Sequence, residues 1–479
     1  MVNRGRGPCR PGRSAVVDVP ICRVVDVPDY TGVHWVRRRT GSASAAGGLE
    51  AGLRILLLGA SGFIGSAVLA RLVQEGHDVR AVARRRGDEL PQVQWIHLDI
   101  ARTTTVPAWR AHADGVDAVV NCAGVLQDGP GDSTRGVHVD AVDALYRACE
   151  EAGVRRVVHL SAVGADRESL SAFSATKKQG EEVLQARDLD WVILRPSVVV
   201  GRPAYGGSAL FRGLAALPVL FRLPDTGPMQ IVQLDDLVRA IVFFLAREAP
   251  ARVALEITGR ERLELDEVVL AYRRWLRFGK PRLIEAPRWF ASLLYRLGDI
   301  AAAFGWRPPV RSTARKEFVR GAVGDPEPWM AATGIEPTPL SVALASEPAS
   351  VQERWFARLY IVKPLVLVVL ALFWIVTGLV SLGPGWDIGL RYMREGGLEA
   401  VGPAGIVAGA IADMAIGLGI AFRRTARPAL YAALLLSVFY MIAGSVLVPR
   451  LWEDPIGPML KIWPIMVLLL VAIAIVEDR

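Results

Sequence analysis

The chain has 479 residues, of which 52% are hydrophobic and only 22% are charged, and its formal net charge is +8. Its mean hydropathy of +0.31 is high for a protein that lies wholly in water, so a membrane part is expected. The composition excludes collagen-like, disordered and disulfide-rich secreted proteins. The four cysteines are scattered and form no Cys-x-x-Cys pair, so no metal site is predicted.

Residues 1–50 are predicted to form a disordered basic tail. They are rich in Arg, Gly and Pro at first and in Ser, Ala and Gly later, without a sustained apolar period. A signal peptide needs a continuous apolar core, which this segment does not have. A targeting role is the alternative.

Residues 51–260 have the pattern of an α/β domain. Short β-branched or Leu-rich runs alternate with stretches of helical length, which predicts βαβ units and a doubly wound parallel Rossmann sheet. Residues 261–350 show helical periods with several tryptophans and are expected to form a mostly helical cap or linker. The expected strands are Arg54–Leu58, Val79–Ala83, Val93–Leu98, Ala118–Asn121, Arg156–Ser161, Trp191–Arg195 and Val253–Ile257.

The strongest motif is Gly59-Ala-Ser-Gly62-Phe-Ile-Gly65, between the first strand and an expected helix over Phe63–Val73. A glycine turn in this position is typical of a dinucleotide site. Gly59 permits the turn, and Gly62 lets the amides of the helix start approach a pyrophosphate; Gly65 allows close packing of the helix on the strand. The residues expected to bind the cofactor here are Gly59, Ser61, Gly62, Phe63, Ile64 and Gly65. A glycine turn without a ligand is the alternative.

The end of the second strand bears on the choice of nucleotide. An NAD site places an acidic residue about 20 positions after the glycines, to bind the ribose 2′-hydroxyl. This chain has Arg84, Arg85 and Arg86 there, with no acid until Asp88. Guanidinium groups suit a 2′-phosphate, so NADP(H) is preferred and NAD(H) is possible. A solvated basic turn is the alternative.

Together with Asp99 in His97-Leu-Asp-Ile100 and with Asn121-Cys-Ala-Gly124 after the fourth strand, this motif resembles an atypical short-chain dehydrogenase/reductase. That branch includes NmrA-like proteins and the NAD(P)H-binding accessory subunit of respiratory complex I. The resemblance covers roughly residues 53–345. It implies a catalytic serine position at Ser161. It also implies cofactor contacts from Asp99, Ile100, Cys122, Ala123, Gly124, Ser161, Lys177 and Pro196.

The catalytic Tyr-x-x-x-Lys pair of that family is incomplete. The matching stretch is Phe173-Ser-Ala-Thr-Lys177, so the resemblance keeps the lysine that binds the nicotinamide ribose and replaces the tyrosine. A phenyl ring has no proton to give, and Ser171 and Ser174 are poor substitutes because their pKa values are far higher. His138 is a possible replacement acid; the alternative is an ordinary histidine on a helix surface.

The last part of the chain, at residues 355–479, has four apolar spans. They lie at about 360–382, 402–422, 428–448 and 457–476, each near the roughly 20 residues that cross a bilayer. This region resembles DoxX-like membrane domains, through its Gly/Ala-rich second span, its Arg423–Arg427 turn and the run Pro449–Lys461. A four-helix transmembrane bundle is therefore expected, with the lipid bilayer as a partner.

The basic residues near the spans predict an orientation. One side holds seven: Arg354, Arg358, Lys363, Arg423, Arg424, Arg427 and Arg479. The other side holds three: Arg391, Arg394 and Arg450. By the positive-inside rule, the nucleotide domain and both termini are cytoplasmic in an inner-membrane protein.

Two charged residues lie inside the apolar spans. Asp413 is near the middle of the second span and Lys461 lies about one turn inside the fourth. Charges at such depth are functional candidates, and an Asp413–Lys461 pair is one hypothesis. In the alternative, Lys461 extends its ammonium to the outer interface.

Two functions remain open. One is a membrane-anchored NAD(P)H-binding protein that lacks the catalytic tyrosine and senses redox state or supports a membrane complex. The other is an NADPH-dependent oxidoreductase acting on a quinone or another membrane-soluble carbonyl acceptor. Nucleic acid is not an expected partner, because the tail and the cytoplasmic loops account for the basic residues.

Overall fold

The computed structural model describes residues 52–85, 87–129, 132–167, 171–223 and 226–476, without the side chains of residues 313 and 314. The predicted tail at residues 1–50 lies outside the described residues, as do Arg86 and Arg479.

A seven-stranded sheet forms the centre of the α/β part, in the order β10-β6-β5-β4-β1-β2-β3. All of its neighbouring strands are parallel. The strands are β1 (Arg54–Leu58), β2 (Asp78–Ala83), β3 (Val93–His97), β4 (Ala118–Asn121), β5 (Arg156–Leu160), β6 (Asp190–Pro196) and β10 (Val253–Ile257). Each strand begins and ends within one residue of its expected bounds, and the predicted parallel Rossmann sheet is confirmed.

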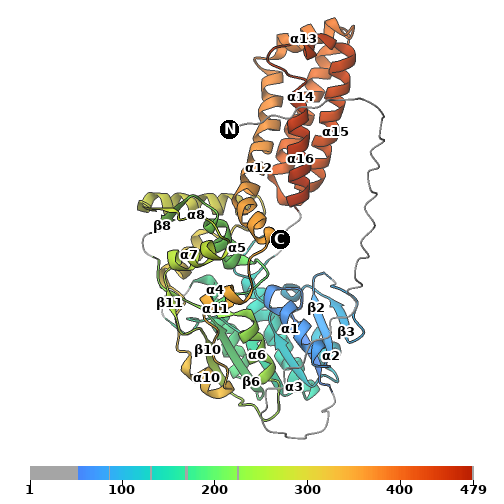
Figure 1. Cartoon of the computed structure of the whole chain (residues 1–479). Coiled ribbons are helices and arrows are strands. Elements are labelled where there is room, and N and C mark those ends of the chain that lie inside the picture. The colour runs from blue at the N-terminus through green and yellow to red at the C-terminus, as the bar shows by residue number, and fades with distance from the viewer. Residues whose placement is uncertain (1–51, 86, 130–131, 168–170, 224–225, 477–479) are drawn as a thin grey trace, which may run out of the picture. The chain divides into compact units, whose positions relative to one another are not determined.

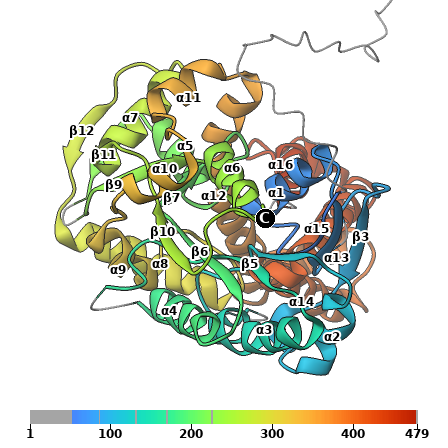
Figure 2. The same ribbon diagram turned by 90° about the horizontal axis from the view of Figure 1, so that it is seen from below.

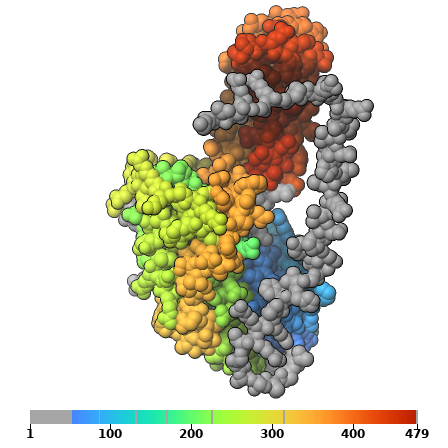
Figure 3. All heavy atoms as spheres, in the orientation of Figure 1, coloured from blue at the N-terminus to red at the C-terminus, as the bar shows by residue number. Residues whose placement is uncertain are grey.

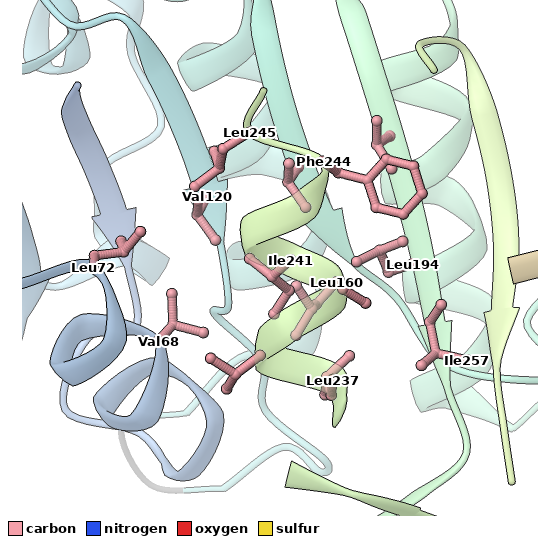
Figure 4. Packing of buried hydrophobic residues seen from close by; sticks show 14 of the residues in the cluster. Val68, Leu72, Val120, Leu160, Leu194, Leu237, Ile241, Phe244, Leu245 and Ile257 are labelled. Atoms are coloured by element: carbon pink, nitrogen blue, oxygen red, sulfur yellow. The ribbon is translucent and has the colours of Figure 1, made fainter. Parts of the chain in front are cut away.

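Helices cover both faces of this sheet (Figure 2). One face packs against α1 (Phe63–Gln74), α6 (Leu234–Phe243) and α10 (Glu327–Thr333), and the other against α2 (Val106–Ala113), α3 (Ala141–Ala152) and α4 (Ala172–Gln185). Residues of β1 alternate between the faces: Ile55 and Leu57 join the first core (part of which is drawn in Figure 4), whereas Leu56 and Leu58 join the second. All four are fully buried, and each such side chain contributes about 2 kcal/mol.

The remaining strands form two small sheets, β11-β9-β7 and β12-β8. Their strands are β7 (Val198–Val200), β8 (Val219–Arg222), β9 (Met229–Gln233), β11 (Arg262–Leu263) and β12 (Arg282–Glu285). The helices beside them are α5 (Gly206–Ala215), α7 (Leu265–Trp275), α8 (Arg288–Ala303), α9 (Ser312–Arg320) and α11 (Leu340–Ser346). Trp329 of α10 is fully buried in the first core of the large sheet, so the chain after residue 261 returns to the Rossmann part.

The C-terminal region is helical (Figure 1). It consists of α12 (Val351–Leu382), α13 (Trp386–Glu395), α14 (Gly402–Ala421), α15 (Arg423–Leu447), the 3₁₀ turn η3 (Pro449–Trp452) and α16 (Ile462–Val476). Among the described residues, α12, α14 and α15 are long and apolar enough to cross a membrane, whereas α16 has 15 residues. The expectation of four spans therefore stays a prediction.

The bundle contacts the rest of the chain at α5 and at the junction of α14 and α15. The N-terminal part of α12 packs on α5, where a Cβ on Gly213 would lie 2.3 Å from a ring carbon of Tyr360. At the junction of α14 and α15, the Trp306 indole donates a hydrogen bond to the Ala421 carbonyl at 2.7 Å. The end of the bundle with the Arg423 turn is thus the end beside the nucleotide-binding part.

Candidate nucleotide site

The turn between β1 and α1 has the backbone geometry of a diphosphate site. Gly59 has φ +73°, and a Cβ there would lie 3.0 Å from the Ala123 amide nitrogen. A Cβ on Gly65 would lie only 2.1 Å from the Gly59 carbonyl oxygen, so the helix packs on the strand at a distance that only glycine allows. Gly62 is the N-cap, and no side chain caps α1. Its first amides therefore lack intrahelical partners and suit an anion.

Aromatic rings stand beside this turn. The ring of Phe63 stacks on that of Tyr205, with centroids 5.5 Å apart and planes within 7°. Ser61 and Ile64 are half-buried, as expected for residues that reach a ligand at a helix start. Tyr205 comes from the segment before α5, 142 positions after Phe63. Its place at the turn could not be read from the motif.

The predicted adenosine end lies beyond β2 and β3. Arg84 donates a hydrogen bond to Asp132 at 2.9 Å, and Arg307 also pairs with this carboxylate, which is largely buried. Arg85 is exposed. After β3, Asp99 caps the short 3₁₀ helix η1 (Ile100–Arg102), whose first residue Ile100 is buried. Both arginines lie where a 2′-phosphate is expected, but Arg84 already has an acidic neighbour.

Lys177 is buried at the carboxyl ends of the central strands. Its ammonium donates hydrogen bonds to the Leu160 carbonyl at 2.8 Å and to the Ala123 carbonyl at 3.3 Å. A Cβ on Gly124 would lie 3.5 Å from the same nitrogen, so the predicted loop residues and the lysine come together. Burial lowers the pKa of Lys177 to about 8. The Asn121 side chain fixes the loop by accepting from the Ala123 amide at 3.0 Å.

Ser161 follows Leu160 at the end of β5. Its backbone amide donates to Leu194, while its buried hydroxyl has no hydrogen-bond partner within the described part of the chain. Because a buried polar atom normally has a partner, this hydroxyl is suited to meet a ligand. In the next loop, the Pro196 carbonyl accepts from the Val163 amide at 3.0 Å. The residues present therefore fit a nicotinamide dinucleotide.

The position of the missing tyrosine is apolar. Phe173 packs edge-on against the His138 ring, with centroids 5.6 Å apart. The two nearby hydroxyls have other partners: Ser171 caps α4 by accepting from the Ser174 amide at 3.1 Å, and Ser174 donates its proton to Glu317 at 2.9 Å. The Ser174 proton is therefore engaged, and the Ser171 oxygen is held at the start of the helix.

His138 is neither a surface histidine nor a free acid, which corrects both sequence interpretations. It is 1% exposed, on a π-helical turn, η2 (Gly136–Asp140), because Gly180 of α4 packs against this turn. Its Nε2 accepts from the Val125 amide at 3.0 Å, so Nδ1 carries the proton and meets the Thr176 hydroxyl at 2.8 Å. Burial, and next the charge of Lys177, lowers the pKa of His138 to about 2, so the ring is neutral at working pH.

Two polar groups near the site were missed. Tyr146 and His159 form a buried cluster with Asn121, in which the Tyr146 hydroxyl lies 2.8 Å from His159 Nδ1. From α9, Glu317 and Arg320 pair with each other and reach Ser174. Asn121 begins the loop motif, and this position could have indicated the first group. In the second group, Ser174 and its partners on α9 are more than 140 positions apart, and no local pattern in the sequence indicates their contact.

In the C-terminal bundle, the hypothesis of an Asp413–Lys461 pair is wrong. Asp413 is 2% exposed on α14 and accepts a hydrogen bond from the Tyr440 hydroxyl of α15 at 2.9 Å. Lys461 is exposed, just before α16, and no ion pair joins it to Asp413 in the described chain. The physical reason is local, because a hydroxyl on the adjacent helix satisfies the carboxylate without burying a second charge.

Comparison with known proteins places both parts of the chain. Residues 59–213 match the NAD(P)H-binding family, and residues 371–470 match the DoxX-like family. "Ceramide reductase" of Caulobacter vibrioides is 27% identical over 237 residues, which cover 49% of this chain and 73% of that protein. The mitochondrial NADH-ubiquinone oxidoreductase 40 kDa subunit of Neurospora crassa is 27% identical over 197 residues, covering 40% of this chain and about half, 48%, of that subunit.

The fold has a counterpart among solved structures. The Bordetella bronchiseptica enzyme WbmG in complex with NAD matches 64% of this chain and 96% of its own, with a TM-score of 0.50 and 16% identity. At this identity the likeness shows the fold alone.

Proposed function

We propose that the chain is a membrane-anchored NADP(H)-binding protein without a proton donor of its own. The premise is that it joins an NAD(P)H-binding domain to a DoxX-like domain, as its motifs predict. The observation that carries this proposal is Phe173, whose ring stands one helical turn before the retained Lys177. The candidate substitutes are bonded elsewhere, as described above for Ser171, Ser174 and His138. Binding and proton donation are thereby separated in one site.

Different residues of the chain bind different parts of the dinucleotide. The amides after Gly62 hold the diphosphate, and Gly59 and Gly65 keep that surface open. Lys177 offers its ammonium to the nicotinamide ribose, while the Phe173 ring has no proton to donate. A bound nicotinamide dinucleotide supplies a hydride. The proton that accompanies a reduction then has to come from solvent.

We propose NADP(H) as the preferred dinucleotide. Arg84 and Arg307 both pair with one carboxylate, Asp132, and Arg85 is exposed next to Arg84 in the chain, so the three cations outnumber this carboxylate. A 2′-phosphate would compete with Asp132 for Arg84, and the excess of cations favours the phosphate. The uncharged 2′-hydroxyl of NAD(H) forms no ion pair with these arginines.

In the cell we propose four spans, with the nucleotide part and both termini in the cytoplasm of an inner-membrane protein. The role that follows from binding without a donor is redox sensing or support of a membrane complex. The complex I subunit among the relatives supports this role. The seven-to-three excess of basic residues supports the orientation.

A second candidate is reduction of a membrane-dissolved acceptor. It is favoured by the relative named as a ceramide reductase, whose alignment covers 73% of that protein. A quinone would take a hydride from the reduced nicotinamide and a proton from water, giving quinol and the oxidised dinucleotide. Such an acceptor needs no tyrosine, so the loss of this side chain leaves the reaction balanced.

Purified full-length protein in nanodiscs separates the candidates. Binding is followed by NADPH fluorescence, and turnover by loss of reduced-nicotinamide absorbance with ubiquinone, menaquinone and ceramide-type carbonyl acceptors. We expect NADPH binding without acceptor-dependent oxidation. Steady oxidation with a quinone would establish the second candidate, and lack of affinity for both NADPH and NADH would refute the two together.

A further inference from the structure

Helix α8 carries an apolar stripe on its outer face. Trp289, Leu293, Leu297 and Ile300 are exposed by 67%, 45%, 52% and 56%, and their spacing of four, four and three puts them on one side of the helix. The opposite side packs inward, where Tyr295 and Gly298 are buried. A helix of this kind has an apolar face that the described chain does not cover.

The stripe continues onto the neighbouring small sheet. Phe221 of β8 contacts Phe290 of α8, with ring centroids 4.9 Å apart, and is the register partner of Ile284 in β12. Ile284 and Phe221 are exposed as well. Of the twelve large hydrophobic side chains that are exposed in the described part of residues 52–350, these two and the four of α8 lie on this surface. A contiguous patch of this kind marks an interaction surface.

The C-terminal end of α8 is fixed at the boundary of the membrane domain. Just after α8, Phe304 accepts a hydrogen bond from the Arg423 amide at 3.1 Å and packs against Phe422 at 5.0 Å between ring centroids. Trp306 bonds to Ala421, the last residue of α14. These residues are where the apolar helices α14 and α15 meet, so the C-terminal end of α8 lies at the end of the bundle, where the bilayer surface is expected. Figure 1 shows α8 running across the direction of the bundle helices, and its segment lies at the surface in Figure 3.

The charges around the patch suit a lipid surface. Residues 280–297 hold four basic residues, Lys280, Arg282, Arg288 and Arg296, against one acidic residue, Glu285. Arg296 is exposed beside the stripe. An apolar stripe flanked by cations is typical of helices that lie in the interface of membranes containing anionic lipids.

We propose that α8 is an interfacial helix, whose patch of α8, β8 and β12 lies in the headgroup and upper acyl region of the membrane that the C-terminal helices cross. This inference rests on the membrane domain and is independent of nucleotide choice or turnover. It also places the following helix, α9, between the lipid and the site. Glu317 and Arg320 of α9 reach Ser174 and the loop at Gly164. A ligand that enters beside α8 would be membrane-dissolved.

The test measures lipid contact at single positions of the full chain. Leu293→Cys is labelled with bimane in a background with Cys9→Ser and Cys22→Ser, reconstituted in nanodiscs containing phosphatidylglycerol. Lipids brominated near the headgroup are the quencher. The matched control is Val342→Cys on α11, 54% exposed and outside the patch. The unsubstituted background measures labelling of Cys122 and Cys149, which are half-buried and buried.

We expect brominated lipids to lower the fluorescence at position 293 by about twofold or more and to leave position 342 unchanged, because interfacial helices reach 5–10 Å into the lipid. Arg296→Glu should reduce the quenching at 293 when the lipids are anionic and not when they are zwitterionic. Equal, weak quenching at both positions would overturn the proposal. So would energy transfer between two labelled copies at 293 without lipid quenching, which would assign the patch to a second copy of the chain.

Discussion

The two ends of the candidate nucleotide site differ in what they are made of. The diphosphate end is backbone: a glycine turn with φ +73° at Gly59, and a helix whose start packs on it through Gly65. The nicotinamide end consists of single side chains, with Lys177 present and Phe173 in place of an acid. A diphosphate site made of backbone is kept as long as the glycine turn keeps its conformation. A proton donor, in contrast, is lost with a single side-chain substitution that the fold tolerates. The diphosphate end therefore predicts which ligand the protein binds, and the nicotinamide end determines whether the bound dinucleotide can react.

The largest effect on NADPH binding should follow from placing a side chain in the glycine turn at the diphosphate end. Gly65→Val would place Cβ 2.1 Å from the Gly59 carbonyl, so helix and strand must separate. We expect a loss of about 2 kcal/mol in the free energy of unfolding, as for overpacked sites, with NADPH affinity lower by about 100-fold. Isothermal titration and thermal unfolding measure the two quantities.

Gly279→Val is the matched control, because a Cβ at Gly279 meets nothing within 4 Å. It should leave both quantities unchanged. If Gly65→Val bound NADPH as the unsubstituted protein does, the diphosphate would have to lie elsewhere.

The next largest effect should be a gain of reductase activity from a substitution at the nicotinamide end. Phe173→Tyr restores a phenol one turn before Lys177, whose ammonium would stabilise the phenolate. NADPH-dependent reduction of a carbonyl acceptor should then appear at about 100-fold above the background oxidation of the unsubstituted protein, the lower part of the range for a positioned acid. Absorbance at the reduced-nicotinamide band measures the rate.

Phe173→Leu, which changes shape without adding a proton, serves as the comparison and should match the unsubstituted protein. Equal rates for all three proteins, in the presence of measurable turnover, would mean that proton supply does not limit this site.

The difference between the ends also explains how much could be predicted from the sequence. The strands and the glycine turn depend on neighbours in the chain, such as the alternation of Ile55, Leu56, Leu57 and Leu58 between two cores. Their positions follow from local pattern, and the predicted sheet was confirmed. The family resemblance to an NAD(P)H-binding domain joined to a DoxX-like domain was confirmed for the same reason.

The errors concern contacts between distant residues. The sequence predicts a free or a surface role for His138, because its partner Thr176 lies 38 positions away. For Asp413 it suggests a pair with Lys461, the other charge in the spans, whereas the partner is the hydroxyl of Tyr440 on the adjacent helix. A pattern of charges shows which residues need a partner. It does not show which surface the tertiary packing brings to them.

A smaller effect is expected for nucleotide choice. Arg84→Asp should weaken NADP(H) by about 30-fold and NAD(H) by no more than about twofold, since only the former carries a 2′-phosphate. Arg71→Asp, on the same domain in an ion pair with Glu75, is the control and should affect neither. Competitive binding of the two dinucleotides measures the ratio. Equal loss for both would refute the NADP(H) assignment.

The smallest effect is a pH dependence that comes from Lys177 alone. Burial lowers the pKa of this ammonium to about 8, so the charged form predominates below that pH and is lost above it. If the ammonium holds the nicotinamide ribose, NADPH affinity should be constant between pH 6 and 7 and fall by up to about tenfold from pH 7 to 9, as the protonated fraction declines. His138 adds nothing in this range because its pKa is about 2.

Lys177→Met is the control: it should bind NADPH more weakly at pH 7, and its affinity should not change with pH. A slope that persists in Lys177→Met would assign the titration to another group and leave the lysine a structural residue, bonded only to the carbonyls of Ala123 and Leu160.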